Sequence, residues 1–258
     1  MSAGAVPDEQ APQAPQAPAA PHGIGRLRPV DVYEASLDGT PVLLRTHQGH
    51  AHPLPAETYL AEHVPGDSSL LTRCTGGTLD VGCGPGRLAA ALTRRGVRSL
   101  GIDISLRAVA LARAAGADAL HGSIFDPLPQ VGPWSTALLA DGNLGIGGEP
   151  VTLLARLRTL LTSHGQVLVE LDPPGSGAHQ LTVRLEHADG AASVWFPWAR
   201  VGVEAIDEVA VQAGLSVVER WSEAGRWFAA LGARPLTAAQ PRSRSCSSPL
   251  GVAPATTT

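Results

Sequence analysis

Three glycines at every second position behind an acidic residue are the feature of this sequence that points most directly to chemistry. They run from Asp80 through Gly82 and Gly84 to Gly86, after a short apolar run. Glycines at this spacing let a backbone pass close to a bound ligand. The acid ahead of them would repel phosphate groups and suits a ligand that carries a positive charge. We therefore predict a ligand-binding turn between a strand and a helix here, and refer to residues 82–86 as the glycine turn.

The segments around the glycine turn alternate in type. From residue 78 onward, short apolar runs alternate with helical patterns, which is typical of a parallel sheet covered by helices. Helices are expected at residues 87–95, 106–115, 150–162 and 203–213. The expected fold class is α/β, a seven-stranded mostly parallel sheet with helices on both faces, whose strands end at the ligand. The seven expected strands are TLDVG, SLGIDI, DALHG, STALLA, QVLVELD, LSVVERW and RWFAAL.

One domain is expected between two tails. Residues 1–23 are rich in Ala, Pro and Gln and residues 234–258 in Ser, Pro and Thr, so both segments are predicted to be disordered. The domain then spans residues 24–233, and residues 24–66 are predicted to form an N-terminal hairpin and cap. The hairpin is placed at VYEASLDGTPVLLR, where Asp38-Gly39 between two alternating runs predicts a type I′ turn.

Composition excludes several classes of function. The net charge of −4 gives no footprint for nucleic acid, and the absence of lysine excludes a pyridoxal-phosphate Schiff base and a Walker A clamp. Three cysteines without a CxxC spacing argue against a zinc site and a disulfide framework. The sequence shows neither a signal peptide nor an apolar run of membrane-spanning length, so a cytoplasmic location without membrane contact is expected.

The glycine turn and the acid before it resemble the first motif of the class I (Rossmann-like) S-adenosylmethionine-dependent methyltransferases, an acidic residue followed by GxGxG. The resemblance covers about residues 67–231. It implies S-adenosyl-L-methionine as the cofactor, bound by Asp80 and the three glycines. Asp103 ends the second strand, 21 residues after Gly82. The resemblance implies that its carboxylate accepts both ribose hydroxyls and that Ile104 packs on one face of the adenine.

A second part of the resemblance lies in HGSIFDPLP, after the third strand. This segment is similar to the adenine-binding turn of the family, with Ile124 and Phe125 as its apolar floor. Many members carry an acid where this chain has Ser123. Either the Ser123 hydroxyl or the Asp126 carboxylate would then accept from the adenine amine, and Asp126 before a proline is also typical of a simple turn.

The fourth strand leads into ADGNLGIGG, which supplies the candidate catalytic residues Asp141 and Asn143. Asn143 is the only asparagine of the chain. Both side chains are expected where cofactor and acceptor meet, where they would position the acceptor or, for Asp141, remove its proton. A tight turn without a catalytic role is the alternative.

The function expected from these features is in-line methyl transfer to a small-molecule acceptor. An NAD(P)-dependent oxidoreductase is the first alternative, but its GxGxxG motif requires a third glycine at Arg87. A non-catalytic S-adenosylmethionine-binding module is the second. His50 and His52 lack a third ligand nearby, so no metal site is expected. The acceptor, the type of methylated atom and the oligomeric state cannot be read from the sequence.

Overall fold

The computed structural model describes residues 27–128 and 133–233, and both predicted tails lie outside this part of the chain. No helix in the described ranges combines the length and the apolar character needed to cross a membrane. The helices and strands are α1 (Pro29–Leu37), β1 (Val42–Thr46), β2 (Ala51–Pro53), α2 (Ala56–Leu60), α3 (Asp67–Arg73), β3 (Thr78–Val81), α4 (Arg87–Arg94), β4 (Ser99–Asp103), α5 (Leu106–Ala114), β5 (Ala119–His121), β6 (Trp134–Leu139), the 3-10 helix η1 (Asn143–Gly148), α6 (Pro150–Leu160), β7 (Leu161–Leu171), β8 (Ala178–His187), β9 (Phe196–Val201), α7 (Ile206–Gln212), β10 (Leu215–Glu223) and β11 (Arg226–Ala233).

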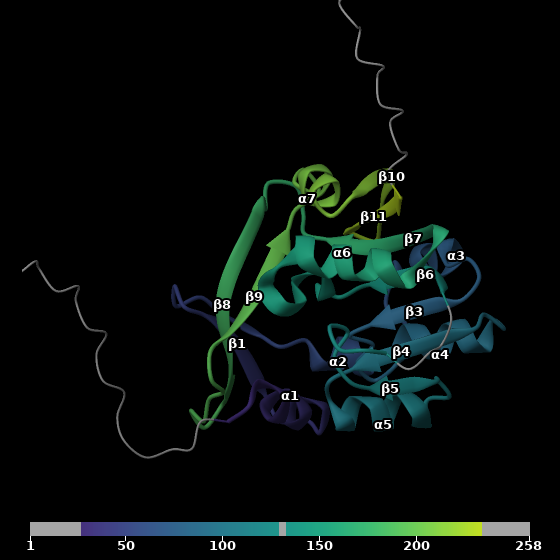
Figure 1. Ribbon diagram of the computed structural model, residues 1–258. Coiled ribbons are helices and arrows are strands. Elements are labelled where there is room, and N and C mark those ends of the chain that lie inside the picture. Colours follow the sequence, from purple (N-terminus) through teal and green to yellow (C-terminus); the bar gives the residue numbers. More distant parts are fainter. Residues whose placement is uncertain (1–26, 129–132, 234–258) are drawn as a thin grey trace, which may run out of the picture.

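The main sheet has seven strands in the order β10-β11-β7-β6-β3-β4-β5 (Figure 1). Pairing is parallel from β7 through β6, β3 and β4 to β5, and β11 is antiparallel to both of its neighbours. The predicted fold class is confirmed, because all seven predicted strands form this sheet. The predicted helices correspond to α4, α5, α6 and α7.

Helices cover the two faces of the main sheet. Leucines of α6 and apolar residues of α7 pack on one face, with alternate residues of β3, β6 and β7. Leucines of α3 and α4 pack on the opposite face (Figure 1). The strands are apolar on both sides because both sides are buried. The chain order reverses between β3 and β6, and the loops after these strands lie at a point where α/β sheets bind ligands.

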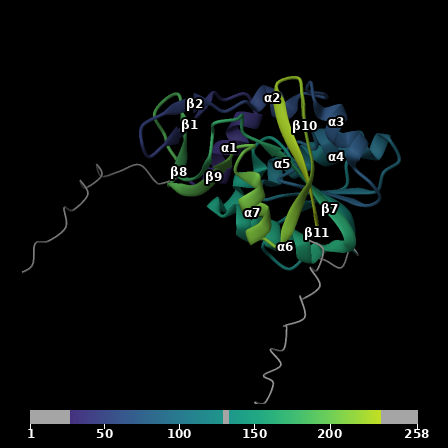
Figure 2. The ribbon, with the colours of Figure 1, turned by 90° about the horizontal axis from the view of Figure 1, so that it is seen from above.

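A second sheet, in the order β2-β1-β8-β9, lies beside the main sheet (Figure 2). It joins the N-terminal strands to a segment inserted between β7 and α7. The paired strands β1 and β8 lie about 140 residues apart in the sequence. The helix α1 packs on one face of this sheet through Val32, which contacts a small core around Val42 and Leu185. The sequence did not predict this sheet.

The predicted hairpin around Asp38-Gly39 is wrong. Residues 29–37 form the helix α1, with Pro29 in its first turn and Asp38 as its C-terminal cap. Gly39 has a positive φ of 92°, as at a type I′ turn, but here it follows the end of a helix. A hairpin does occur one element later, where β1 and β2 pair around residues 47–50.

Candidate active site

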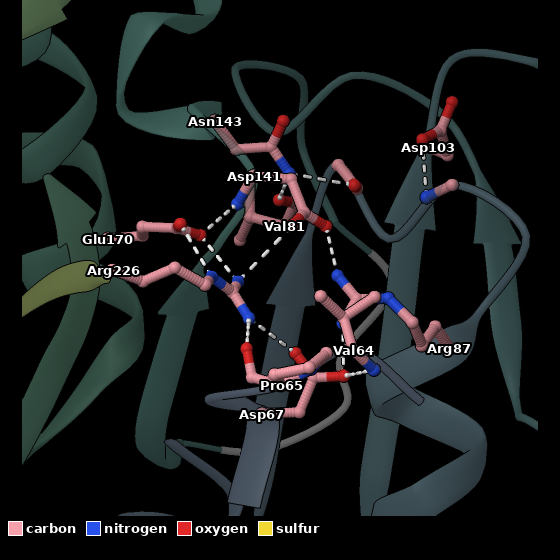
Figure 3. Close-up of polar contacts among 12 residues, drawn as sticks. Val64, Pro65, Asp67, Val81, Arg87, Asp103, Asp141, Asn143, Glu170 and Arg226 are labelled. Atoms are coloured by element: carbon pink, nitrogen blue, oxygen red, sulfur yellow. Dashed lines mark hydrogen bonds and ion pairs between the residues drawn. The ribbon is translucent and has the colours of Figure 1, made fainter. Parts of the chain in front are cut away.

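The glycine turn leaves the carboxyl end of β3 and leads directly into α4. All three glycines have positive φ, from 53° at Gly84 to 87° at Gly86, which side chains rarely tolerate. The N–H of Gly84 donates to Asp103 Oδ2 at 2.9 Å. The turn is therefore tied to the end of the neighbouring strand β4, and the two sequence-predicted features lie side by side (Figure 3).

Asp103 also accepts the N–H of Ser105 at Oδ1, at 2.8 Å. Ser105 in turn caps α5 by accepting the N–H of Ala108. Burial raises the pKa of Asp103, although the N–H groups of Ser105 and Gly84 stabilise the charged form. Each carboxylate oxygen has a second lone pair, so Asp103 retains acceptor capacity for a ligand at the strand end.

Asp80 lies in the middle of the sheet, two residues before Gly82, and it is buried, with 3% of its surface exposed. Burial raises its pKa to about 7, and the nearby charge of Asp141 adds to this effect. The carboxyl group therefore titrates near neutral pH, beneath the glycine turn. A positive charge above the turn would favour its ionised form.

Apolar side chains stand exposed where the adenine was predicted to lie. Ile104, directly after β4, is 59% exposed, and Phe125 is 42% exposed, whereas Ile124 is buried in the core. Ser123 accepts the N–H of Phe125 at 3.2 Å, and within the described chain no hydrogen bond engages the Asp126 carboxylate. The choice between Ser123 and Asp126 as adenine partner remains open.

Asp141 follows β6 and has the positive φ of 54° that is uncommon for a residue with a side chain. Its carboxylate pairs with Arg87 at 2.5 Å and with Arg226 at 3.4 Å. Its own N–H donates to Glu170 Oε2 at 2.7 Å (Figure 3). Burial raises the pKa of Asp141, against the attraction of Arg87.

Asn143 begins η1 and turns its amide toward the glycine turn. Its Nδ2 donates to the carbonyl oxygens of Val81 at 3.0 Å and Gly82 at 2.9 Å (Figure 3). A Cβ atom added to Gly82 would lie 2.8 Å from this nitrogen. The structure thus brings both candidate catalytic residues to the edge of the turn, with Asn143 supporting it directly.

The largest group missed by the sequence analysis is a cluster of five charged residues, hereafter the ionic cluster. Burial opposes the ionisation of Asp67, yet the guanidinium groups of Arg87 and Arg226 hold the pKa of Asp67 below its usual range. Arg226 also pairs with Glu170 at 2.7 Å. The sequence did carry a signal for this cluster, since Glu170 and Arg226 are charged residues beside the apolar runs of β7 and β11. The cluster consists of Asp67, Arg87, Asp141, Glu170 and Arg226 (Figure 3).

The second sheet contacts the site through η1. A Cβ atom on Gly145 would overlap the indole of Trp198 in β9, and one on Gly148 would lie 2.7 Å from Pro197. Ile146 of η1 reaches back to Gly82, where an added Cβ would lie 3.0 Å from its Cδ1. The strand β9 thus packs, through Trp198, against the loop that carries Asn143.

No group of three or more potential metal ligands occurs among residues 27–128 and 133–233. His50 lies in the turn between β1 and β2, and His52 is exposed on β2. The described cysteines Cys74 and Cys83 are buried thiols.

Residues 78–165 match the family model described as a methyltransferase domain. The matched segment contains the glycine turn, Asp103, the predicted adenine turn and both candidate catalytic residues. A comparison with curated proteins finds no match.

Solved structures share the fold. An S-adenosylmethionine-dependent methyltransferase from Bacteroides fragilis, in complex with S-adenosyl-L-homocysteine, is 23% identical with a TM-score of 0.64, over 80% of this chain and 93% of that one. The glycopeptide N-methyltransferase MtfA, complexed with S-adenosylmethionine, is 15% identical with a TM-score of 0.50, over 65% of this chain and 92% of that one. At these identities the likeness concerns the fold.

Proposed function

We propose that this chain, whose residues 78–165 match a methyltransferase domain, is a class I (Rossmann-like) S-adenosylmethionine-dependent methyltransferase that methylates a small-molecule acceptor by in-line transfer. The observation that carries the proposal is the pairing of the glycine turn with Asp103 at adjacent strand ends. This pair lies inside the segment that matches the methyltransferase domain. The cofactor is S-adenosyl-L-methionine, and the acceptor is the part that we infer.

The residues present fit this cofactor. Gly84 leaves open space on the side where a Cβ would lie, apart from one hydroxyl at 3.2 Å. Asp103 offers acceptor capacity for hydroxyl groups, and exposed Ile104 and Phe125 offer apolar contact to a flat ring. We infer that these residues, with Gly82, Gly86, Ser123 and Ile124, bind the cofactor. Asp80 adds negative charge below the turn.

Electrostatics favour a cationic ligand at this end of the sheet. The ionic cluster contains three carboxylates and two guanidinium groups, and Asp80 and Asp103 lie nearby. The local excess of acidic groups suits a sulfonium and an ammonium group and disfavours a pyrophosphate. Arg87 occupies the position where a dinucleotide motif requires glycine, and its side chain is buried in the cluster.

The bound cofactor supplies a methyl group on a sulfur that is already an activated leaving group. The chain then has to hold the acceptor in line and exclude water. We infer that Asp141 and Asn143 perform the positioning, because Asn143 contacts Gly82 of the glycine turn and Asp141 pairs with Arg87 directly after it. Asp141 is held on two sides by Arg87 and Arg226, which fixes its place. A role of Asp141 as a base remains part of the proposal.

The acceptor is inferred to be small for two reasons. The net charge of −4 provides no surface for a nucleic-acid backbone. Residues of the second sheet and of α1 also lie close to the site, since Trp198 packs on η1 and the Tyr33 hydroxyl lies by Gly84, so they limit the approach of a large acceptor.

The test is transfer of labelled methyl groups from S-adenosylmethionine to a panel of small hydroxyl, amine and carbon acceptors. Once an acceptor is found, Asp141→Asn and Asn143→Ala should lower turnover by about 100-fold. Cofactor affinity should change much less in Asp141→Asn than turnover does. Asp118→Asn, an exposed carboxylate at the start of β5, serves as the matched control.

Equal losses of affinity and turnover in both variants would place the loop in the cofactor site and not at the acceptor. Unchanged turnover in both would support the alternative of a simple turn. Binding of the cofactor without transfer to any acceptor would favour the non-catalytic module.

A further inference from the structure

The chain contains only two tyrosines, and their rings lie together beside the glycine turn. Tyr33 belongs to α1 and Tyr59 to α2, so both come from the N-terminal part that precedes the matched domain at residues 78–165. Their rings meet edge to face, with centroids 6.3 Å apart. The sequence analysis assigned neither of them a role.

Tyr33 points its hydroxyl at the glycine turn. A Cβ atom added to Gly84 would lie 3.2 Å from Tyr33 Oη, and apart from the adjacent residues 83 and 85 no other atom of the described chain comes within 4 Å of that position. Within the described residues no hydrogen bond engages this hydroxyl. This hydroxyl is therefore free to donate to, or accept from, a polar group of a ligand at the glycine turn.

The two tyrosine rings lie near different acidic residues of the site. Burial raises the pKa of Tyr33, and the charge of Asp103 adds to it. Burial also raises the pKa of Tyr59, with Asp141 and Glu170 adding to it. Tyr33 lies by Gly84, whose N–H donates to Asp103, and Tyr59 lines a cavity together with Arg87 of the ionic cluster.

Two acidic residues hold α1 against α5. Glu34 accepts the hydroxyl of Ser105 at 2.9 Å and the N–H of Arg107 at 3.2 Å. Asp38 at the end of α1 pairs with Arg107 at 2.6 Å. Because Ser105 also donates its N–H to Asp103, the position of α1 is fixed relative to the proposed ribose-binding carboxylate.

We propose that Tyr33 is a cofactor-binding residue, whose hydroxyl hydrogen-bonds S-adenosylmethionine bound between α1 and the glycine turn. The proposal rests on the proposed function. The helix α1 is then one wall of the cofactor site, although it lies outside the matched methyltransferase domain. The binding site is completed by residues about 50 positions before the glycine turn, brought there by packing on the second sheet.

The test is calorimetric titration of S-adenosyl-L-homocysteine into the full-length wild type, Tyr33→Phe and Tyr59→Phe. Both variants remove one hydroxyl from the same ring pair and keep the aromatic contact. Tyr33→Phe should weaken binding about tenfold, the effect of one lost hydrogen bond to a polar ligand, and Tyr59→Phe less than threefold. Hydrogen exchange adds a readout independent of affinity, since the bound ligand should protect the amides of α1 in the wild type.

If the wild type binds the ligand and Tyr33→Phe binds it with the same affinity, the proposal is overturned. Equal weakening in the two variants would also overturn it, since the effect would then come from the ring pair and not from the hydroxyl at Gly84. A wild type that binds no ligand would contradict the proposed function itself, which is a separate outcome.

Discussion

At the residue scale, the three glycines of the turn are required for three different reasons. Gly84 faces the space under Tyr33, whereas a Cβ on Gly86 would lie 2.6 Å from Ala112 of α5. Gly82 lies against the Asn143 amide. Spacing alone suggested a single role for all three, that of admitting a ligand. The structure gives that role most directly to Gly84 and gives Gly86 a role in helix packing.

This difference predicts that one alanine variant loses mainly cofactor affinity and another loses mainly stability. Gly84→Ala should lower cofactor affinity by more than tenfold with a modest loss of stability, because its new methyl group enters the ligand space. Gly86→Ala should lower the melting temperature by several degrees, because α4 and α5 must separate. Gly96→Ala is the matched control, with a φ of 73° and no atom within 4 Å of the added Cβ. Equal affinity of Gly84→Ala and Gly96→Ala for the cofactor would refute the assignment of Gly84.

Asp80 yields a prediction about pH. Its folded-state pKa of about 7 lies above the ordinary value, so the folded protein holds a proton that the unfolded chain releases. The free energy of unfolding contributed by Asp80 is therefore greatest at low pH and falls as pH rises from about 4 through 7. Asp80→Asn should melt roughly 5 °C higher than the wild type at pH 8 and close to it at pH 4, where the unfolded chain also takes up the proton that Asp80 holds in the folded state. Thermal denaturation at the two pH values measures this, and a pH-independent difference would contradict it.

At the scale of elements, the ionic cluster links five parts of the chain, and Arg226 alone joins four of them. Arg226 at the start of β11 contacts Asp67 of α3, Glu170 of β7 and Asp141 after β6. Its side chain is only 14% exposed, and within the cluster Glu170 pairs with Arg226 alone, whereas Asp67 and Asp141 also pair with Arg87. The cluster thereby fixes the loop of Asp141 beside the glycine turn.

Removal of Arg226 should therefore destabilise the protein strongly. Arg226→Ala leaves partly buried carboxylates without their partner, at a cost of about 3 kcal/mol in the free energy of unfolding. Arg220→Ala removes an exposed pair with Asp207 from the adjacent strand β10 and should cost less than about 1 kcal/mol. Chemical denaturation of both variants compares them. A similar loss in the free energy of unfolding in both variants would show that the ionic cluster stabilises the fold no more than an exposed ion pair does.

The alternation of strands and helices was predictable because both faces of the main sheet are buried, which gives short apolar runs at regular intervals. The first helix was misread because Gly39 with positive φ ends a helix as readily as it forms a hairpin turn. The second sheet was missed because β8 carries charged residues such as Arg184 and Glu186, and its partner β1 is distant in the chain. Local patterns do not encode such pairings.

The candidate site was predictable to the extent that it depends on strand ends. Asp103 and the glycine turn could be placed together because parallel strands bring their carboxyl ends to one edge. Tyr33 and Arg226 could not, since each reaches the site through tertiary packing. No spacing rule connects residues 33 or 226 with residue 84.

At the scale of the whole molecule, two sheets meet at the carboxyl ends of the main strands (Figure 1). The main sheet provides the glycine turn and Asp103, and the second sheet packs on η1 through Trp198. The helix α1 closes the arrangement near Gly84 and is held to α5 by Glu34. The domain limits at residues 24 and 233 stay a prediction, since both tails lie outside the described residues.

The central claim is that S-adenosylmethionine binds between the glycine turn and the carboxylate of Asp103. Titration calorimetry of the wild type and Asp103→Ala with S-adenosylmethionine tests it most directly. We expect the wild type to bind and the variant to bind about 10- to 100-fold more weakly, since charge-assisted hydrogen bonds to the ribose are lost. Absence of binding by the wild type, or equal affinity in Asp103→Ala, would contradict the account.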